Sequence, residues 1–249
     1  MLNQEKLDKS TPIPLYFQLK KLIVGEIKNG NYKIGDLIPT EFELSELFQI
    51  SRTTIRQAIN ELVQEGWLYR VKSKGTFVTK PKINQDFIQT IRSFNSEILS
   101  SGHTPSTAVL DMKITDPPEK VRHELNLDDS AKAIFIHRKR YADEEPIVMV
   151  KTFLPYDRCG FVLEHDFVKE SLYSVLSTNN NTRIYKIRRL VEAVDANSYD
   201  MHQLNIKRGR AIQQFISTGY NVFNEPIEYS IAHYRGDRNS FEVYVAPGV

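Results

Sequence analysis

The stretch Thr40–Thr79, which reads TEFELSELFQISRTTIRQAINELVQEGWLYRVKSKGTFVT, decides the fold of the N-terminal part of the chain. Thr40 with Glu43 three residues later has the spacing of a capping box, so we expect a helix to begin there. Ser51 is a good N-cap for a second helix, whose apolar residues recur at helical spacing and which Gly66 is well placed to end. Two helices joined by so short a turn predict a helix-turn-helix.

Two short segments, 67–71 and 76–79, follow the second helix and flank the basic turn Lys72–Gly75. Their spacing predicts a β-hairpin, which would complete a winged helix-turn-helix. The exposed face of the second helix then carries polar and basic side chains: Arg52, Thr53, Arg56, Gln57 and Asn60. Such side chains hydrogen-bond base edges and phosphates when the N-terminal end of a helix enters the major groove of DNA.

Charge separates this interpretation from a helix-turn-helix whose polar face is merely solvated. Residues 1–51 carry six lysines against seven acidic residues, a net charge of −1. Residues 52–80 carry six basic residues against two acidic ones, a net charge of +4. Because the positive charge is concentrated on the helix and wing that would face phosphates, the sequence favours binding to double-stranded DNA.

The composition of the whole chain is that of an ordinary soluble protein, with 249 residues, a hydrophobic fraction of 41% and a charged fraction of 26%. The formal net charge is only +2, so any attraction to nucleic acid must be local. Cys159 is the single cysteine, so no internal disulfide can form. No apolar run reaches transmembrane length and the first residues do not resemble a signal peptide, so we expect a cytoplasmic protein with no membrane partner.

A proline, two lysines and polar residues after the last wing strand mark a domain boundary. We expect a DNA-binding domain at residues 1–80, a linker at 81–86, and an α+β domain with a mostly antiparallel sheet at 87–249. Strands are expected at 32–35, 107–115, 133–141, 147–153, 183–193, 211–221, 228–235 and 241–245. Helices of the second domain are expected at 87–101, 118–127, 171–177 and 197–204. Its two hairpins, YADEEPIVM from Tyr141 and YNVFNEPIEY from Tyr220, resemble each other and suggest an internal duplication.

Four segments in a fixed order resemble the GntR family of bacterial repressors: PLYFQL (Pro14–Leu19), GDLIPTEFEL (Gly35–Leu44), SRTTIRQAINELVQEGWL (Ser51–Leu68) and KGTFV (Lys74–Val78). We expect the winged domain to contact an operator through Thr40, Glu41, Ser51, Arg52, Thr53, Thr54, Arg56, Gln57, Lys74, Gly75 and Thr76. Two positions depart from the family pattern. Phe42 stands where a basic residue is common, which would remove a phosphate contact. Ser73 stands where the first wing glycine is common, and serine does not readily adopt φ > 0.

The C-terminal part resembles the HutC subfamily, whose effector domain, the UTRA domain, is similar in fold to chorismate lyase. The resemblance is carried by R-x-R-x-A-D-x-x-P-I from Arg138, by Leu154-Pro155, by SLY at Ser171–Tyr173, and by the run from Pro226 to Phe241. The six histidines show no cluster with metal-ligand spacing, which argues against a GntR regulator with a helical, metal-binding effector domain. We therefore expect no cofactor.

Arg138 and Arg140 alternate with other residues on the strand expected at 133–141, so they share one face with Ile134 and Ile136. Burying two guanidinium groups requires anionic partners, and the planar fork of arginine suits a phosphate or a carboxylate. The sequence alone leaves two possibilities open. The pair could hold an anionic ligand, or each arginine could pair with an Asp or Glu at the edge of the sheet.

The resemblance to the HutC subfamily favours the ligand. It implies that Arg138 and Arg140 hold the phosphate of a sugar phosphate, assisted by Phe94, Asn95, Ser171 and Tyr173, and that Glu228, Ser230 and Tyr234 lie on the sugar side. Val150 departs from the pattern, because an acid is common there in relatives that bind sugar phosphates. A valine accepts no hydrogen bond, so the ligand could instead be another anion, such as a carboxylate.

The expected function is therefore a ligand-responsive repressor that binds a short inverted repeat as a homodimer, since one winged domain reads only a short half-site. Two other classes remain open. A lyase-like enzyme would need an acid and base pair against a substrate, and the sequence offers no motif for one. A DNA-binding protein without any ligand would not be stabilised by sugar phosphates.

Overall fold

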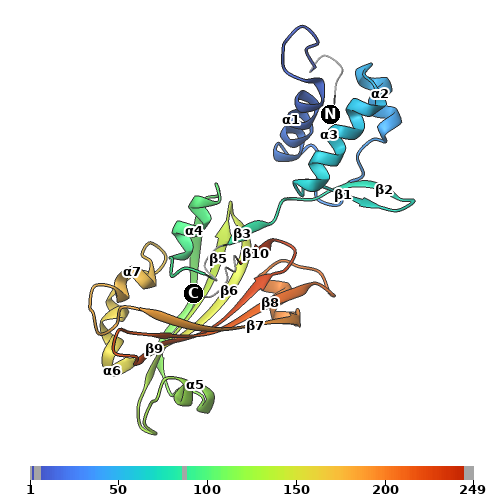
Figure 1. Ribbon diagram of the computed structural model, residues 1–249. Coiled ribbons are helices and arrows are strands. Elements are labelled where there is room, and N and C mark those ends of the chain that lie inside the picture. The colour runs from blue at the N-terminus through green and yellow to red at the C-terminus, as the bar shows by residue number, and fades with distance from the viewer. Residues whose placement is uncertain (1, 3–6, 86–88, 244–249) are drawn as a thin grey trace, which may run out of the picture. The chain divides into compact units, whose positions relative to one another are not determined.

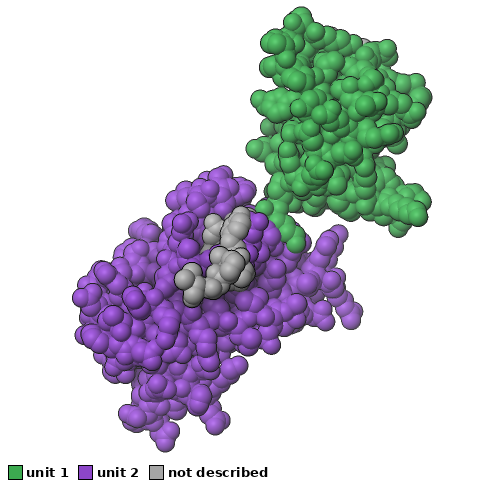
Figure 2. Space-filling model, viewed as in Figure 1, with its two compact units in different colours: residues 1–82 green, residues 83–249 purple. Residues whose placement is uncertain are grey.

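The computed structural model describes residues 2, 7–85 and 89–243, and the chain divides into two compact units between Lys82 and Ile83 (Figure 2). The division falls inside the expected linker at 81–86. Residues Ile83–Gln85 form the short strand β3 of the second unit, so the linker is shorter than expected.

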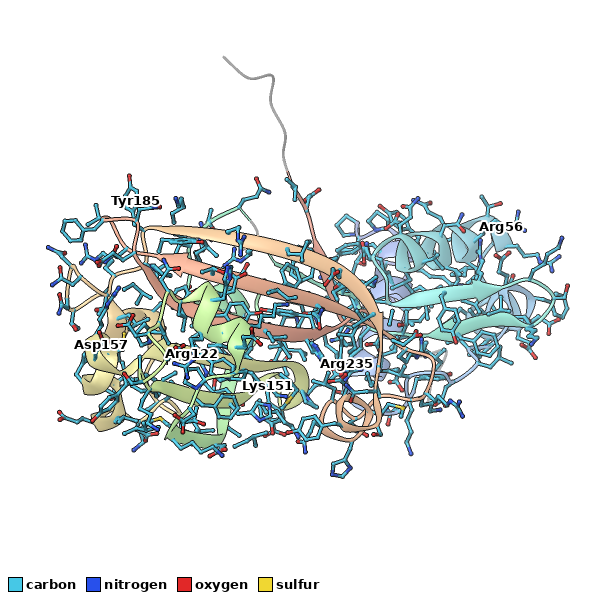
Figure 3. All side chains as sticks on the ribbon, turned by 90° about the horizontal axis from the view of Figure 1, so that it is seen from below. Arg56, Arg122, Lys151, Asp157, Tyr185 and Arg235 are labelled. Carbon is cyan, nitrogen blue, oxygen red and sulfur yellow. The ribbon has the colours of Figure 1, made fainter. Side chains whose placement is uncertain are left out.

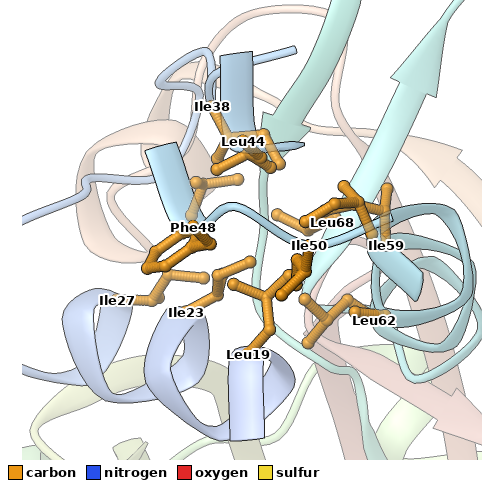
Figure 4. Packing of buried hydrophobic residues seen from close by; sticks show 13 residues of the cluster. Leu19, Ile23, Ile27, Ile38, Leu44, Phe48, Ile50, Ile59, Leu62 and Leu68 are labelled. Carbon is orange, nitrogen blue, oxygen red and sulfur yellow. The ribbon is translucent and has the colours of Figure 1, made fainter. Parts of the chain in front are cut away.

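The first unit is a winged helix-turn-helix. Its elements are α1 (Leu15–Lys28), α2 (Glu41–Phe48), α3 (Arg52–Gln64), β1 (Leu68–Val71) and β2 (Gly75–Val78). The apolar stripes of the three helices meet in one core, where Leu19, Ile23, Leu44, Phe48 and Leu62 are at most 1% exposed (Figure 4). This core fixes the angle between α2 and α3 and leaves the opposite face of α3 in solvent.

Local side-chain caps set the N-terminal ends of both α2 and α3, as the sequence predicts. The Thr40 hydroxyl accepts from the Glu43 amide at 3.2 Å, and the Glu43 carboxylate accepts from the Thr40 amide at 2.7 Å, which completes a capping box at α2. The Ser51 hydroxyl caps α3 by accepting from the Thr54 amide at 3.2 Å. Gln49 ends α2 with φ of 51°, and this left-handed residue makes the turn.

The prediction of a strand at 32–35 is wrong. The Asp36 amide donates to the Lys33 carbonyl and the Lys33 amide donates to the Asp36 carboxylate, so these residues close a turn. Gly35 has φ of +93°, which is incompatible with a strand. Only Leu37 forms a bridge, with Phe77 of β2.

The second unit is built on a six-stranded antiparallel sheet in the order β4-β5-β6-β9-β8-β7 (Figure 1). The strands are β4 (Pro105–Thr115), β5 (Ala133–Ala142), β6 (Glu145–Pro155), β7 (Lys186–Asp195), β8 (Ala211–Tyr220) and β9 (Pro226–Arg235). The remaining elements are α4 (Phe94–Ser100), α5 (Glu119–Glu124), α6 (Tyr156–Cys159), a 3-10 helix at Gly160–Glu164, α7 (Leu172–Leu176), α8 (Ser198–Gln203) and β10 (Asn239–Phe241).

The sheet consists of two copies of one β-α-β-β arrangement. The first copy is β4-α5-β5-β6, the second is β7-α8-β8-β9, and β6 pairs with β9 where the copies join. Each copy has a register shift directly before its hairpin, between Arg140 and Tyr141 in one and between Gly219 and Tyr220 in the other. The structure thus agrees with the duplication that the two hairpin sequences suggest.

Helices cover both faces of this sheet, and alternation along each strand decides which residues face which layer. On one face, Ile134 and Ile136 pack with Cys159 of α6 and with Leu172 and Leu176 of α7. On the other face, residues of α5 and α8 pack in two separate clusters. One contains Val121 of α5 and Leu125 directly after it, and the other contains Met201 of α8. The even-numbered residues of β5, Arg138 and Arg140 among them, therefore point to the α6–α7 side.

Two other expectations need correction. The helix expected at 87–101 begins only at Phe94, because the Ser93 hydroxyl accepts from the Ser96 amide and starts the helix there; Phe87 lies outside the described residues. The last strand covers Asn239–Phe241 rather than 241–245, and it pairs in parallel with β3; residues 244 and 245 lie outside the described residues. Strands of three residues are too short to show a periodic pattern.

Candidate functional site

The exposed face of α3 carries the side chains that the sequence singles out. Arg52, Thr53, Arg56 and Gln57 are all exposed, while Ile55 and Ala58 are fully buried in the core. Figure 3 shows Arg56 projecting from this unit. The geometry presents one helical face that is free of apolar contacts to the rest of the unit.

The first turn of α2 organises the arginines of this surface. The Arg56 Nε donates to the Glu41 carboxylate at 3.0 Å, and the Arg70 guanidinium donates to the other oxygen of the same carboxylate at 3.1 Å. The Arg52 guanidinium carbon lies 5.3 Å from the centre of the Phe42 ring. Arg70, on β1, is a residue that sequence reasoning missed, because alternation along a four-residue strand does not reveal which partner it reaches.

Three other polar residues expected to face DNA take part in helix caps. Thr40 closes the capping box of α2, and the Ser51 and Thr54 hydroxyls lie 2.8 Å apart at the start of α3. All three therefore help to fix the N-terminal ends of α2 and α3.

The wing turn requires residues with positive φ. Ser73 adopts φ of +62° despite being a serine, and Gly75 has φ of +118°. A Cβ at Gly75 would lie 2.5 Å from the Leu37 Cδ1, so a side chain there would be strained and crowded. Lys74 is exposed beside it and Thr76 is partly buried. The wing therefore presents a lysine and a bare stretch of backbone side by side.

In the second unit, nine of the ten residues expected to bind a ligand line a single cavity. These are Phe94, Arg138, Arg140, Val150, Ser171, Tyr173, Glu228, Ser230 and Tyr234. Asn95 is partly exposed and is not part of the lining. The cavity lies on the α6–α7 side of the sheet, and β5, β6 and β9 supply its floor.

The two arginines of β5 face this cavity. The charge of Glu228 favours their charged forms, but no carboxylate of a described residue forms an ion pair with either. Arg138 is 3% exposed and its guanidinium donates to the Thr152 hydroxyl at 3.0 Å, while the Arg140 guanidinium carbon lies 4.9 Å from the centre of the Phe94 ring. Among the described residues, neither Nε has a hydrogen-bond partner. Burial lowers the pKa of Arg140 and, together with the nearby charge of Arg140, lowers the pKa of Arg138 to about 9. A bound anion would favour the charged form of both arginines and so raise their pKa values again.

Glu228 and Tyr173 meet across the same cavity. The Tyr173 hydroxyl donates to the Glu228 carboxylate at 2.6 Å, and Glu228 is 3% exposed. Burial and then the Glu228 carboxylate raise the pKa of Tyr173 well above its usual value, so the hydroxyl stays a donor. Ser171 stands at the N-cap of α7, yet its side chain makes no cap hydrogen bond. Its hydroxyl is therefore available at the cavity wall.

The cavity also contains charged residues that sequence reasoning missed, namely Arg92, Glu97 and Arg189. Glu97 is 3% exposed and follows Phe94 by three residues on α4, so an acid among apolar positions of one helix face was the available signal. Arg189 comes from β7, which alternation alone could not connect to β5. With these residues the lining has four arginines and two glutamates, which is a formal excess of two positive charges.

The described part of the chain shows neither a metal site nor a membrane-spanning helix. No group of three or more His, Cys, Asp or Glu side chains is arranged there to hold a metal ion. Nor does any helix within those residues have the length and apolar character needed to cross a membrane.

Comparison with known proteins gives the family. The chain is 32% identical over 239 residues to the HTH-type transcriptional repressor NagR of Bacillus subtilis, covering 96% of this chain and 98% of that protein. Residues 15–78 match the gntR family of bacterial regulatory proteins, and residues 100–240 match the UTRA domain. The chain belongs to the GntR family.

Other GntR-type relatives agree. The chain is 25% identical over 225 residues to the probable fructoselysine utilization operon transcriptional repressor of Escherichia coli (strain K12), covering 90% of this chain and 91% of that protein. Its fold is similar to the crystal structure of PhnF from Mycobacterium smegmatis, with a TM-score of 0.75 at 22% identity over 94% of this chain and 99% of that chain. As a GntR-family protein with a UTRA domain, the chain is a DNA-binding transcriptional regulator that responds to a ligand, and not an enzyme.

Proposed function

We propose that this GntR-family protein is a dimeric repressor whose affinity for its operator is set by a phosphorylated sugar bound in the cavity of the second unit. The observation that carries the proposal is the pair Arg138 and Arg140, which faces a cavity without a carboxylate partner among the described residues. Two guanidinium forks and an excess of two positive charges suit a dianionic phosphate monoester better than a single carboxylate.

The residues that β9 contributes to the cavity suit a ligand with several hydroxyl groups. Glu228, Ser230 and Tyr234 lie on one face of β9, with Ala232 between the last two, and all of them line the cavity. A carboxylate and two hydroxyls can accept and donate hydrogen bonds to sugar hydroxyl groups. A relative named for fructoselysine utilization is consistent with a sugar-derived effector.

Val150 bears on which sugar is bound. It is 8% exposed, lines the cavity, and is the register partner of Arg138 on the neighbouring strand. A valine at this point offers an apolar contact where an acid would hold an amine or a hydroxyl. We therefore expect the ligand to have no amino group beside its phosphate end.

On the DNA side, we propose that α3 enters the major groove with Arg52 and Arg56 reading base edges, while Lys74 and Gly75 of the wing approach the minor groove. Thr40, Glu41, Ser51, Thr53, Thr54, Gln57 and Thr76 would contact phosphates or hold the two arginines in place. The exposure of the α3 face and the orientation of both arginines by α2 support this docking.

The dimer is proposed to form through the second unit. β7 is an outermost strand of the sheet, and its Leu190 and Val191 are 54% and 44% exposed. A long edge with apolar side chains is a ready surface for a second copy. Leu190→Lys should shift the protein to monomer in sedimentation at micromolar concentration. Leu110→Lys, on the other outermost strand, is the matched control because Leu110 is 43% exposed.

The test of the ligand is operator binding titrated against a panel of sugar phosphates, the unphosphorylated sugars and carboxylates, with the parent and Arg138→Ala side by side. We expect the parent to respond to a sugar phosphate by about 5–150-fold in operator affinity. Arg138→Ala should bind the operator like the parent and ignore the ligand. Equal responses of the two proteins would exclude the arginine clamp, and a response to carboxylates alone would replace the ligand class. In the same titration, Val150→Glu should gain a response to an amino-sugar phosphate.

A further inference from the structure

Phe42 is an exposed aromatic residue on the DNA-facing side of the first unit. It lies in the first turn of α2 and is 50% exposed. It is absent from the side chains that form the core of this unit or pack against it. Its ring instead lies beneath the Arg52 guanidinium, with 5.3 Å between the guanidinium carbon and the ring centre. Phe42 contacts a residue of α3 instead of the core, so it does not contribute to the core packing of α2.

The contact with Arg52 limits where the ring can be during DNA binding. The quadrupole of an aromatic ring attracts a cation above its face. A planar guanidinium can stack on that face while the N–H groups at its edge stay accessible. Stacking leaves the N–H groups at the end of the guanidinium free for a bidentate contact with the O6 and N7 of a guanine. The 5.3 Å between the guanidinium carbon and the ring centre is long enough for the ring to reach the neighbouring base pair, since successive base pairs are about 3.4 Å apart.

The chemistry of the major groove tells what such a ring can recognise. Thymine is the one base that presents a methyl group there, and apolar side chains, phenylalanine included, read it by direct contact. Phe42 accepts no hydrogen bond from cytosine or adenine and carries no charge for a phosphate. The substitution of a basic residue by Phe42 therefore replaces a contact that ignores sequence with one that depends on it.

We infer that Phe42 and Arg52 read one base step together: Arg52 binds a guanine, and Phe42 contacts the methyl group of a thymine in the adjacent base pair. The inference rests on the docking of α3 proposed above and adds a specificity-determining residue outside the recognition helix. Glu41, the residue before Phe42, holds Arg56 and Arg70 at the same time. The first turn of α2 thus acts as the platform for base reading by α3.

The test removes single methyl groups from the DNA. An operator duplex is first selected from randomised DNA with the full chain, and each thymine of one half-site is then replaced in turn by deoxyuridine, which lacks only the methyl group. We expect one replacement to weaken binding by the parent about three- to fivefold, the effect of one buried methyl group. The guanine read by Arg52 is the one whose replacement weakens binding by the parent but not by Arg52→Ala. The thymine should lie in the base pair next to that guanine.

Variants separate the methyl contact from the positioning of Arg52. Phe42→Ala should bind the thymine and deoxyuridine duplexes equally well. Phe42→Leu should keep the methyl effect, because leucine retains an apolar surface, but lose affinity at the guanine. Leu47→Ala is the control on the same helix, since Leu47 is 36% exposed, and it should retain the full methyl effect.

Two outcomes overturn different statements. If no deoxyuridine replacement distinguishes the parent from Phe42→Ala, while Arg52→Ala still loses its guanine preference, Phe42 does not read thymine and the docking stands. If Arg52→Ala binds every duplex as the parent does, the docking itself is wrong. Thermal unfolding of each variant shows whether the first unit has kept its fold.

Discussion

The hydroxyl of Tyr173 on α7 donates a 2.6 Å hydrogen bond to the carboxylate of Glu228 on β9. This bond closes one side of the cavity, because the two residues come from different layers of the second unit. Both groups are buried, so a lost partner cannot be replaced by bulk water.

Tyr173→Phe should therefore lower the free energy of unfolding of the second unit by about 1–3 kcal/mol, the cost of leaving a buried carboxylate without its donor. The measurement is urea unfolding followed by circular dichroism. Trp67, the single tryptophan, lies in the first unit and reports that unit separately by fluorescence. Tyr185→Phe is the control, because Tyr185 is 70% exposed and projects into solvent (Figure 3). Equal effects of the two changes would contradict the prediction.

Arg140→Met should stabilise the second unit without ligand, by on the order of 1 kcal/mol, while abolishing the response to effector. The reason is that burial disfavours the charge of Arg140, that this charge lowers the pKa of Arg138, and that the Glu228 carboxylate offsets these effects only in part. Lys139→Met changes the same strand on its other face and should alter stability little. A clear destabilisation by Arg140→Met would mean that the arginine serves the fold rather than a ligand.

Gly75→Ala and Gly25→Ala should have opposite effects on the first unit. At Gly75, φ of +118° and the approach of Leu37 Cδ1 to 2.5 Å penalise a side chain, so Gly75→Ala should cost about 1–3 kcal/mol and weaken binding to all DNA sequences. Gly25 is inside α1, with no atom within 4 Å of an added Cβ. Gly25→Ala should therefore raise stability by about 0.5–1 kcal/mol. Trp67 fluorescence during urea unfolding measures both, and equal signs would refute the argument.

His137 makes the second unit sensitive to acid. It is 7% exposed, its Nε2 has no hydrogen-bond partner among the described residues, and burial followed by the charge of Lys151 lowers its pKa, while Asp111 opposes this. The unfolded chain takes up a proton on this histidine near pH 6.5, whereas the folded chain resists it. Stability is therefore unaffected by this group above about pH 6.5 and is lost as the pH falls below that value.

His137→Phe should flatten this loss, since a phenylalanine can keep the ring contacts with Tyr199 and Phe135 without a proton to bind. The measurement is the midpoint of urea unfolding between pH 7 and pH 5. His202→Gln, at an exposed position on α8, should retain the pH dependence of the parent. An unchanged slope in His137→Phe would show that another group is responsible.

The first unit was predictable because its signals are local. The capping box at Thr40, the cap at Ser51 and the helical spacing of Ile55 and Leu62 are all contained within a few residues of chain. In the second unit, alternation was enough to bring Arg138 and Arg140 to one face, and likewise Glu228, Ser230 and Tyr234. The resemblance supplied Phe94, Ser171 and Tyr173.

What the sequence did not reveal depends on pairing between distant strands. Arg189 reaches the cavity because β7 follows β8 in the sheet, which no local pattern states. Glu97 was missed although it follows Phe94 by three residues in the expected helix, because an acid on a helix is more often exposed than buried. The parallel pair of β3 and β10 joins segments more than 150 residues apart, and its strands are too short to carry a signal.

The duplicated sheet gives the cavity a direction. Tyr141 and Tyr220 occupy equivalent places after the two register shifts, so Arg138 and Arg140 correspond to Ser217 and Gly219 in the second copy. Had the second copy repeated this pair, both halves of the sheet would present two neighbouring arginines, and an anionic ligand would find equivalent partners in either orientation. At Gly219 the second copy has no side chain, and an added Cβ would lie 3.1 Å from the Ile184 Cδ1 and 3.4 Å from the Glu228 Oε2. Because the second copy lacks this arginine pair, we expect a ligand with one anionic end to bind with that end at Arg138 and Arg140.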